Sequence, residues 1–267
     1  DVLRRPKKEP TVRAPHRPTP PDLRDRILWI PNMHPFTTEF FAAALRRNGY
    51  DARALPLETE QSFELGHSLT RGSECLPTAL TIGSLLTVLR TFPKDAKHAF
   101  FMPTAQGPCR FGQYITLHQQ ILEREGFGDV PIMSPSHFKG FQGLEEPVRR
   151  SLWKGMLAGD ILMKAGCKVR PYELDPGQTN YLLEHELRRL AKVIEEDGDL
   201  VAGIRSAIHN ISSVRQNRDR KKPLVGIVGE IYVRNNSYAN EDVVRSVEKL
   251  GAEAWLAPLS EWILFTS

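Results

Sequence analysis

Short apolar runs alternate with amphipathic stretches over the first half of the chain, and this alternation constrains the fold more than any other feature. The run RILWI at 26–30 has the length of a buried strand. The stretch TTEFFAAALRRNG at 37–49 has helical spacing, with Thr37 or Thr38 as the expected N-cap and Gly49 past its end. Strands alternating with helices indicate βαβ units and a parallel sheet. The alternation continues through expected strands at 51–56, 98–102 and 130–134 and expected helices at 76–90 and 111–126.

The pattern then changes twice. Residues 145–222 are mostly helical in spacing, and strand patterns return at 223–229 and 253–258, separated by an expected helix at 241–251. We therefore expect an α/β fold with a flavodoxin-like parallel-sheet domain over residues 25–144 and a helical connector over 145–222. Residues 223–267 are expected to begin a second α/β domain, which holds so few elements that we expect it to be truncated.

The first 24 residues differ in composition from the rest. They carry seven Lys or Arg, three Asp or Glu and six of the 20 prolines, and so hold the whole formal net charge of +4. A basic, proline-rich segment of this kind is typical of an extended linker. A nucleic-acid-binding arm is the alternative, but the remainder of the chain is neutral, and we expect no nucleic-acid partner.

Cysteine content and hydropathy suggest the compartment. The chain has three cysteines, an odd number, and we see no secretory signal, which favours a reducing cytoplasm over a disulfide framework. No apolar run approaches the roughly 18 residues of a membrane span. We expect a cytoplasmic protein without a membrane partner.

Two of the cysteines share a local setting. Cys75 in RGSECLPTALTIG and Cys109 in QGPCRFGQY each stand directly before an expected helix, and Cys109 also follows an expected strand. A helix N-terminus favours a thiolate over a thiol, and ligands bind at the carboxyl ends of the strands in open α/β sheets. These residues alone leave three roles open: small buried hydrophobes, a catalytic Cys–His pair, or ligands of a metal or cluster. Cys167 follows a helix C-terminus, which disfavours a thiolate, and is expected to be structural.

Several longer stretches resemble one protein family. They are RGSECLPTALTIGSLL, AFFMPTAQGPCRFGQY, RPYELDPGQT, PLVGIVGEIYVRNN and WLAPLSEWILFTS. Over about residues 25–267 the chain resembles the dehydratase-type part of the 2-hydroxyacyl-CoA dehydratase and benzoyl-CoA reductase superfamily. It is most similar to large activase-related proteins, to which the double-cubane cluster proteins are related.

The resemblance implies an iron–sulfur cluster, either [4Fe–4S] or double-cubane. It places Cys75 and Cys109 at two ligand positions, with Gly107 and Pro108 shaping the turn, and it implies a third protein ligand that is not in this chain. Iron–sulfur clusters are held by cysteine thiolates, which suits these residues. No catalytic residue is assigned. Glu74 and Glu230 are candidates for proton transfer, and Arg110 and Arg234 are candidates for contact with a phosphate or with cluster charge.

The function implied by the resemblance is electron transfer to a difficult reaction. The protein would accept low-potential electrons from an ATP-dependent activator, a domain or subunit with its own iron–sulfur cluster. These electrons would drive reduction or radical dehydration of an acyl-CoA-type substrate, as in a lyase or a reductase component, and we expect an oligomer. The alternative is a non-catalytic docking module of a large activase, without a cluster of its own.

Overall fold

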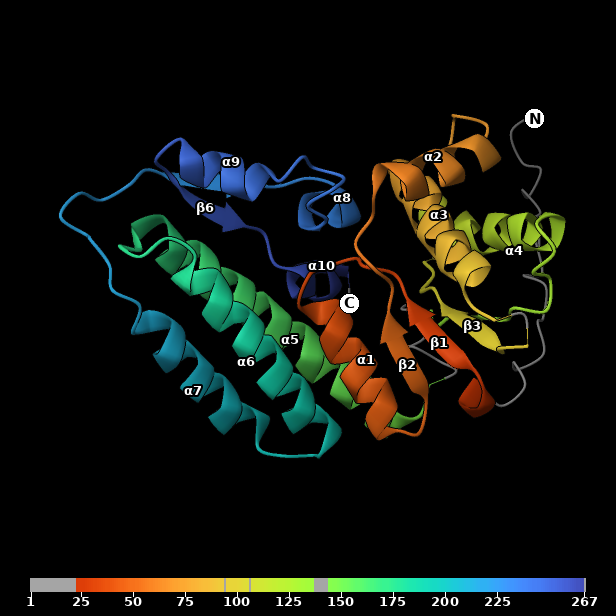
Figure 1. The fold of residues 1–267 in the computed structure, drawn as a ribbon, viewed down its shortest axis with the longest axis horizontal. Coiled ribbons are helices and arrows are strands. Elements are labelled where there is room, and N and C mark those ends of the chain that lie inside the picture. Colours follow the sequence, from red (N-terminus) through yellow and green to blue (C-terminus); the bar gives the residue numbers. More distant parts are fainter. Residues whose placement is uncertain (1–22, 94, 106, 137–143, 267) are drawn as a thin grey trace, which may run out of the picture.

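A computed structural model describes residues 23–93, 95–105, 107–136 and 144–266 and confirms the expected α/β class. Four parallel strands form one sheet in the order β2-β1-β3-β4 (Figure 1). Their bounds are Ile27–Ile30 for β1, Asp51–Ala54 for β2, His98–Phe101 for β3 and Ile132–Met133 for β4. With helices on both faces, this is a flavodoxin-like parallel-sheet domain.

Side chains from successive residues of β1 enter two separate cores. Leu28 and Ile30 belong to one buried cluster, and Trp29 belongs to the other. Side chains alternate between the two faces of a strand, so a strand covered on both faces is apolar throughout. This explains why RILWI is a continuous apolar run rather than an alternating one.

Different helices cover the two faces of the sheet. On one face lies α1 (Thr37–Arg47), packed against the long helix α5 (Glu146–Val169) and against α6 (Gln178–Glu195). On the other face lie α2 (Glu60–Leu69), α3 (Leu76–Thr91) and α4 (Tyr114–Arg124) (Figure 1). Helices α5 and α6, which come from the expected helical connector, therefore complete one of the two cores of the first domain.

The remaining elements form a smaller second unit. Strands β5 (Leu224–Ile227) and β6 (Glu253–Leu256) pair in parallel, with α8 (Ile231–Asn235) and α9 (Val243–Lys249) between them in sequence. Helix α7 (Leu200–Ser212) precedes this unit, and α10 (Leu259–Thr266) follows it. Arg170, which begins a 3-10 turn after α5, donates two 2.7 Å hydrogen bonds to the Glu248 carboxylate and so anchors α9 to α5.

Three local features differ from the sequence-based expectations or lie outside them. The prediction of Thr37 or Thr38 as the N-cap of α1 is wrong, because the N-cap is Phe36 and no side chain of that residue caps the helix. Leu23 is buried in the first core, inside the segment expected to be a linker, whereas residues 1–22 lie outside the described residues. Within the described part of the chain, every helix is too short or too polar to cross a bilayer.

Candidate functional site

A large cavity opens at the carboxyl ends of β1 and β3. Its volume is about 710 Å³, and it is lined by Ile30 at the end of β1, by Pro31 after it, and by residues 101–104 at the end of β3. Strand β2 pairs with one edge of β1, and β3, which comes later in the sequence, pairs with the other edge of β1. The cavity therefore lies at the point where the strand order reverses, which is where open α/β sheets bind ligands.

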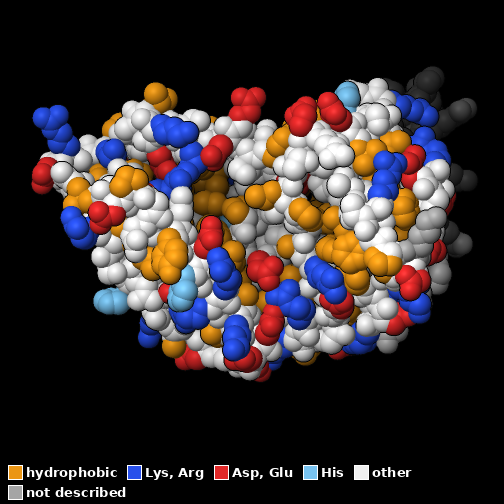
Figure 2. Space-filling model, in the orientation of Figure 1, with side chains coloured by type: hydrophobic (Ala, Val, Ile, Leu, Met, Phe, Trp, Pro, Cys, Tyr) orange, Lys and Arg blue, Asp and Glu red, His pale blue; other side chains and the backbone are white. Residues whose placement is uncertain are grey.

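Walls of the cavity come from both units of the protein. The first half of α5 contributes Trp153 and Met156, α8 contributes Tyr232 and Arg234, and α10 contributes Trp262. Figure 2 shows hydrophobic side chains gathered in the hollow between the two lobes. A site of this size, mostly apolar and shared between two units, has the ordinary character of a small-molecule pocket.

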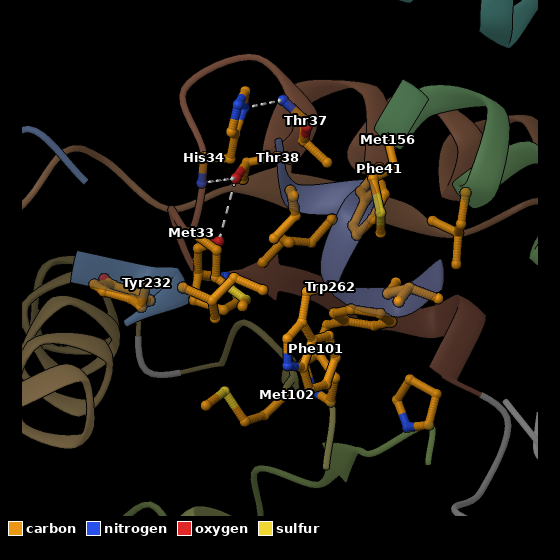
Figure 3. Close-up of a pocket in the computed structure, with 18 of the residues that line it drawn as sticks. Met33, His34, Thr37, Thr38, Phe41, Phe101, Met102, Met156, Tyr232 and Trp262 are labelled. Atoms are coloured by element: carbon orange, nitrogen blue, oxygen red, sulfur yellow. Dashed lines mark hydrogen bonds between the residues drawn. The ribbon is translucent and has the colours of Figure 1, made fainter. Parts of the chain in front are cut away.

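His34, in the loop after β1, caps the helix that follows. Its Nδ1 accepts hydrogen bonds from the backbone N–H groups of Phe36 (3.3 Å) and Thr37 (3.2 Å), and the bond from Thr37 is drawn in Figure 3. The neutral ring must then carry its proton on Nε2. Burial lowers the pKa of His34 to about 4, which Asp160 opposes and the charge of Arg234 reinforces. His34 is thus a neutral capping residue at neutral pH.

Asp160 of α5 connects this loop to the second unit. Its carboxylate accepts hydrogen bonds from the backbone N–H groups of Leu259 (2.8 Å) and Ser260 (2.9 Å), at the start of α10. Nε2 of His34 lies 3.9 Å from Oδ1 of the same carboxylate. Asp160 therefore fixes α10, and with it Trp262, against the edge of the sheet.

Cys75 and Cys109 occupy equivalent positions. Cys75 is the N-cap of α3, with Pro77 in its first turn, and Cys109 is the N-cap of the 3-10 turn Arg110–Gln113 that leads into α4. Cys109 is exposed and lines the cavity; Cys75 is half-buried, and the cavity reaches its helix at Pro77. Each cysteine therefore directly precedes a helix or a 3-10 turn.

The two cysteine loops contact each other. Arg110 donates a 2.5 Å hydrogen bond to the carbonyl of Ser73, two residues before Cys75. Tyr114, at the start of α4, lies beside Cys75: burial raises the pKa of its phenol, Thr78 opposes this, and the neighbouring thiol raises it further. Arg110 and Tyr114, which follow Cys109 in the chain, thus both contact the segment that carries Cys75.

The remaining predicted residues divide into those that line the cavity and those that do not. Glu230 and Arg234 line it, although Glu230 also caps α8 by accepting from Val233 N–H and Arg234 donates to the carbonyls of Gly229 and Pro258. Glu74 and Arg110 are not among the lining residues. Desolvation raises the pKa of Glu74, but backbone N–H donors, including those of Arg71 and Ser73, outweigh it and hold this pKa below its ordinary value.

The turn before Cys109 has the geometry that its sequence suggests. Gly107 has φ of +103°, a left-handed conformation that glycine adopts without strain, and Pro108 follows it. Cys167, by contrast, is buried near the end of α5, and burial raises the pKa of its thiol to about 11. Cys167 is therefore a buried, protonated thiol, which suits a structural role and not that of a metal ligand.

The described residues supply two free cysteines in matching positions but not a complete metal site. Among them, no three His, Cys, Asp or Glu side chains gather closely enough to hold a metal ion. Cys75 and Cys109 fit a soft iron centre in donor type and in their helix N-terminal setting. They could serve as two ligands, with further ligands required from elsewhere.

Sequence reasoning did not anticipate one buried polar cluster beside the cavity. The carboxylate of Glu58, only 6% exposed, accepts hydrogen bonds from Tyr232 Oη (2.5 Å) and Asn236 Nδ2 (2.7 Å). Asn236 also donates to the carbonyl of Asn32 (3.0 Å). Burial raises the pKa of Glu58, and the two donors partly offset this. The stretch GEIYVRNN holds both donors, but nothing in the sequence pairs them with Glu58.

Comparisons with family models, curated proteins and solved structures found no match to this chain.

Proposed function

We propose that this chain is an iron–sulfur protein of the 2-hydroxyacyl-CoA dehydratase type. Cys75 and Cys109 would be two ligands of the cluster, and a third thiolate would come from another segment or from a partner chain. The observation that carries the proposal is the pairing of two N-capping cysteines on contacting loops, one of which lines the cavity at the strand-order reversal.

A bound cluster would supply one-electron chemistry at the cavity. The chain's own residues would bind and orient the acyl-CoA-type substrate there, and the apolar walls would exclude water from it. The electrons would come from an ATP-dependent activator in the cytoplasm. Exposed Cys109 and half-buried Cys75 suit this role, because a cluster near the surface can accept electrons from a partner.

The test compares three serine variants of the full chain with the parent protein, all purified without oxygen. Cys75→Ser and Cys109→Ser should each lose iron and visible absorbance and change the low-temperature EPR spectrum, because serine replaces a soft ligand by a hard one. Cys167→Ser is the matched control and should retain the iron of the parent. Full iron occupancy in both Cys75→Ser and Cys109→Ser would refute the assignment.

A parent protein that binds no iron would instead favour the docking module without a cluster. To ensure that a missing partner does not mimic this result, iron and sulfide should also be supplied during reconstitution in the presence of a thiol. The docking role has no observation of its own in its favour beyond the incomplete ligand set.

A further inference from the structure

The loops that carry Cys75 and Cys109 meet at one edge of the cavity. Arg110 follows Cys109 directly, and its 2.5 Å hydrogen bond to the carbonyl of Ser73 ties the second loop to the first. Cys109 and Pro77, which lies two residues after Cys75, line the same cavity. The two thiols are therefore carried by neighbouring segments that are held together by a side-chain contact.

Each of these loops has a glycine shortly before its cysteine. Gly72 has φ of +80° and Gly107 has φ of +103°, and a Cβ built on either of them would meet no atom within 4 Å. Glycine adopts this left-handed conformation without strain and populates other backbone conformations about as readily. Because both glycines stand in open space, a rotation at either one can redirect the cysteine that follows it. Such adjustment brings two thiols to the narrow geometry of a disulfide, in which the Cα atoms lie within about 7 Å of each other.

The three cysteines differ in their access to solvent. Cys109 is exposed, Cys75 is half-buried and Cys167 is only 3% exposed. A dissolved oxidant reaches an exposed thiol first, and cysteines that respond reversibly to oxidation are accessible and often lie beside a second, resolving cysteine. Cys109 therefore meets the oxidant, Cys75 is the neighbouring thiol, and Cys167 is protected inside α5.

From these observations we infer that Cys109 and Cys75 form a reversible intramolecular disulfide when hydrogen peroxide oxidises the protein without a cluster. Peroxide transfers one oxygen to the sulfur of Cys109, which becomes a sulfenic acid, and its other oxygen leaves as water. The sulfur of Cys75 then attacks that of Cys109, so that the S–S bond forms, the S–O bond breaks and a second water leaves. Two thiols and one peroxide thus give one disulfide and two waters, and a dithiol reverses the reaction by exchange.

The inference does not depend on the proposed function, but it adds a consequence to it. A metal is bound by the thiolate of cysteine, and a sulfur within a disulfide is not a thiolate. Disulfide formation and cluster binding would therefore exclude each other at Cys75 and Cys109. The oxidised chain would accept iron only after reduction.

Peptide mapping tests the inference, because trypsin places the three cysteines in separate peptides: residues 72–90, 98–110 and 165–168. The reduced, iron-free full chain is treated with hydrogen peroxide, unfolded with an alkylating agent and digested without reductant. The monomer, isolated by non-reducing electrophoresis, should contain peptide 72–90 linked to peptide 98–110, and dithiothreitol should release both. Peptide 165–168 should be recovered alkylated. Absence of the linked peptide at a peroxide dose that oxidises Cys109 would overturn the inference, as would a predominant link to Cys167 or between two chains.

Three serine variants assign the order of the steps. Cys75→Ser should leave Cys109 as a sulfenic acid that dimedone traps, because the resolving thiol is missing. Cys109→Ser should consume peroxide at least about fivefold more slowly than the parent, because its remaining thiols are less accessible. Cys167→Ser is the control and should form the linked peptide as the parent does. Equal rates of peroxide consumption in Cys109→Ser and the parent would contradict Cys109 as the first thiol oxidised.

Arg110→Gln tests the contact between the loops. The shorter glutamine side chain should lose the hydrogen bond to Ser73, so that dimedone traps more of Cys109 before Cys75 reaches it. Arg71→Gln, at an exposed arginine in the loop before Cys75, is the control and should behave as the parent. Equal trapping in these two variants would contradict the loop contact as the basis of the pairing.

Because the mapping uses iron-free protein, the two proposals fail separately. Iron binding at Cys75 and Cys109 without a linked peptide after peroxide treatment refutes the disulfide alone. A linked peptide from a chain that binds no iron when reduced refutes the cluster alone. If both proposals hold, the peroxide-treated chain should take up iron only after treatment with dithiothreitol.

Discussion

Tyr232 donates a 2.5 Å hydrogen bond to the buried carboxylate of Glu58, a residue 174 positions earlier in the chain. Glu58 lies between β2 and α2 of the first domain, and Tyr232 lies on α8 of the second unit. The bond closes one side of the cavity, just as Asp160 closes another by capping α10. The cavity therefore depends on polar contacts between units as well as on packing.

Tyr232→Phe should destabilise the protein by about 1–3 kcal/mol, because it leaves a buried carboxylate oxygen without its donor. The measurement is the free energy of unfolding from urea titration at neutral pH. Tyr181→Phe removes the same hydroxyl from a side chain that is 67% exposed and should change stability little. Equal urea midpoints for the two variants would show that the hydrogen bond from Tyr232 to Glu58 does not contribute to stability.

Acidification should destabilise the fold through two buried histidines. Burial lowers the pKa of His34 and of His118 from 6.5 to about 4. Between these values the unfolded chain binds protons that the folded protein does not, so the stability present above pH 6.5 is lost as the pH falls towards 4. The free energy of unfolding should fall by up to about 3 kcal/mol per histidine.

His118→Gln isolates one of these contributions. His118 Nε2 lies 3.3 Å from both Thr78 O and Thr81 Oγ1, contacts that a glutamine amide can partly replace. The stability of the variant should depend less steeply on pH between 6.5 and 4 than that of the parent. His185→Gln, at a side chain that is 60% exposed, is the control. If the stability of His118→Gln depends on pH as steeply as that of the parent, the pKa of His118 is not lowered in the folded protein.

The positions of the strands along the sequence and the location of Cys75 and Cys109 before helices could be predicted, because both depend on neighbouring residues. Continuous apolar runs indicated strands buried on both faces, and the residues around Cys75 and Pro77 indicated the start of a helix. Helix α2 was not predicted, because its segment has few apolar residues. It begins instead with a capping box between Thr59 and Ser62, where serine replaces the usual acidic or amide partner.

The polar framework of the cavity could not be predicted in the same way. His34 caps α1 through its ring nitrogen, a role that the preference for Thr37 or Thr38 as N-cap concealed. Asp160 sits within a helix whose apolar spacing says nothing of the distant α10 that it caps. Pairings across roughly 100 residues or more are set by the packing of whole elements, and a local pattern in one sequence carries no information on them.

Gly83→Ala should be strongly destabilising because α2 and α3 cross with their backbones in contact. A Cβ on Gly83 would lie 1.9 Å from the carbonyl oxygen of Ser62, so the helices would have to separate. Overpacking of this kind costs about 1–3 kcal/mol or more. Gly226→Ala is the control, because a Cβ there meets no atom within 4 Å. A thermal transition of Gly83→Ala equal to that of the control would contradict the close crossing.

Cys167→Ser should separate packing from metal binding at the third cysteine. The side chain is 3% exposed, its sulfur lies 3.9 Å from that of Met163, and burial raises its pKa to about 11. A hydroxyl in this buried position should lower the free energy of unfolding by about 1–3 kcal/mol. Cys167→Ala introduces no polar group and should cost less than serine if desolvation dominates.

Both variants should keep the iron content of the parent, since a protonated, buried thiol is a poor metal ligand. Loss of iron from Cys167→Ala at a temperature where the variant remains folded would place this cysteine in the cluster instead.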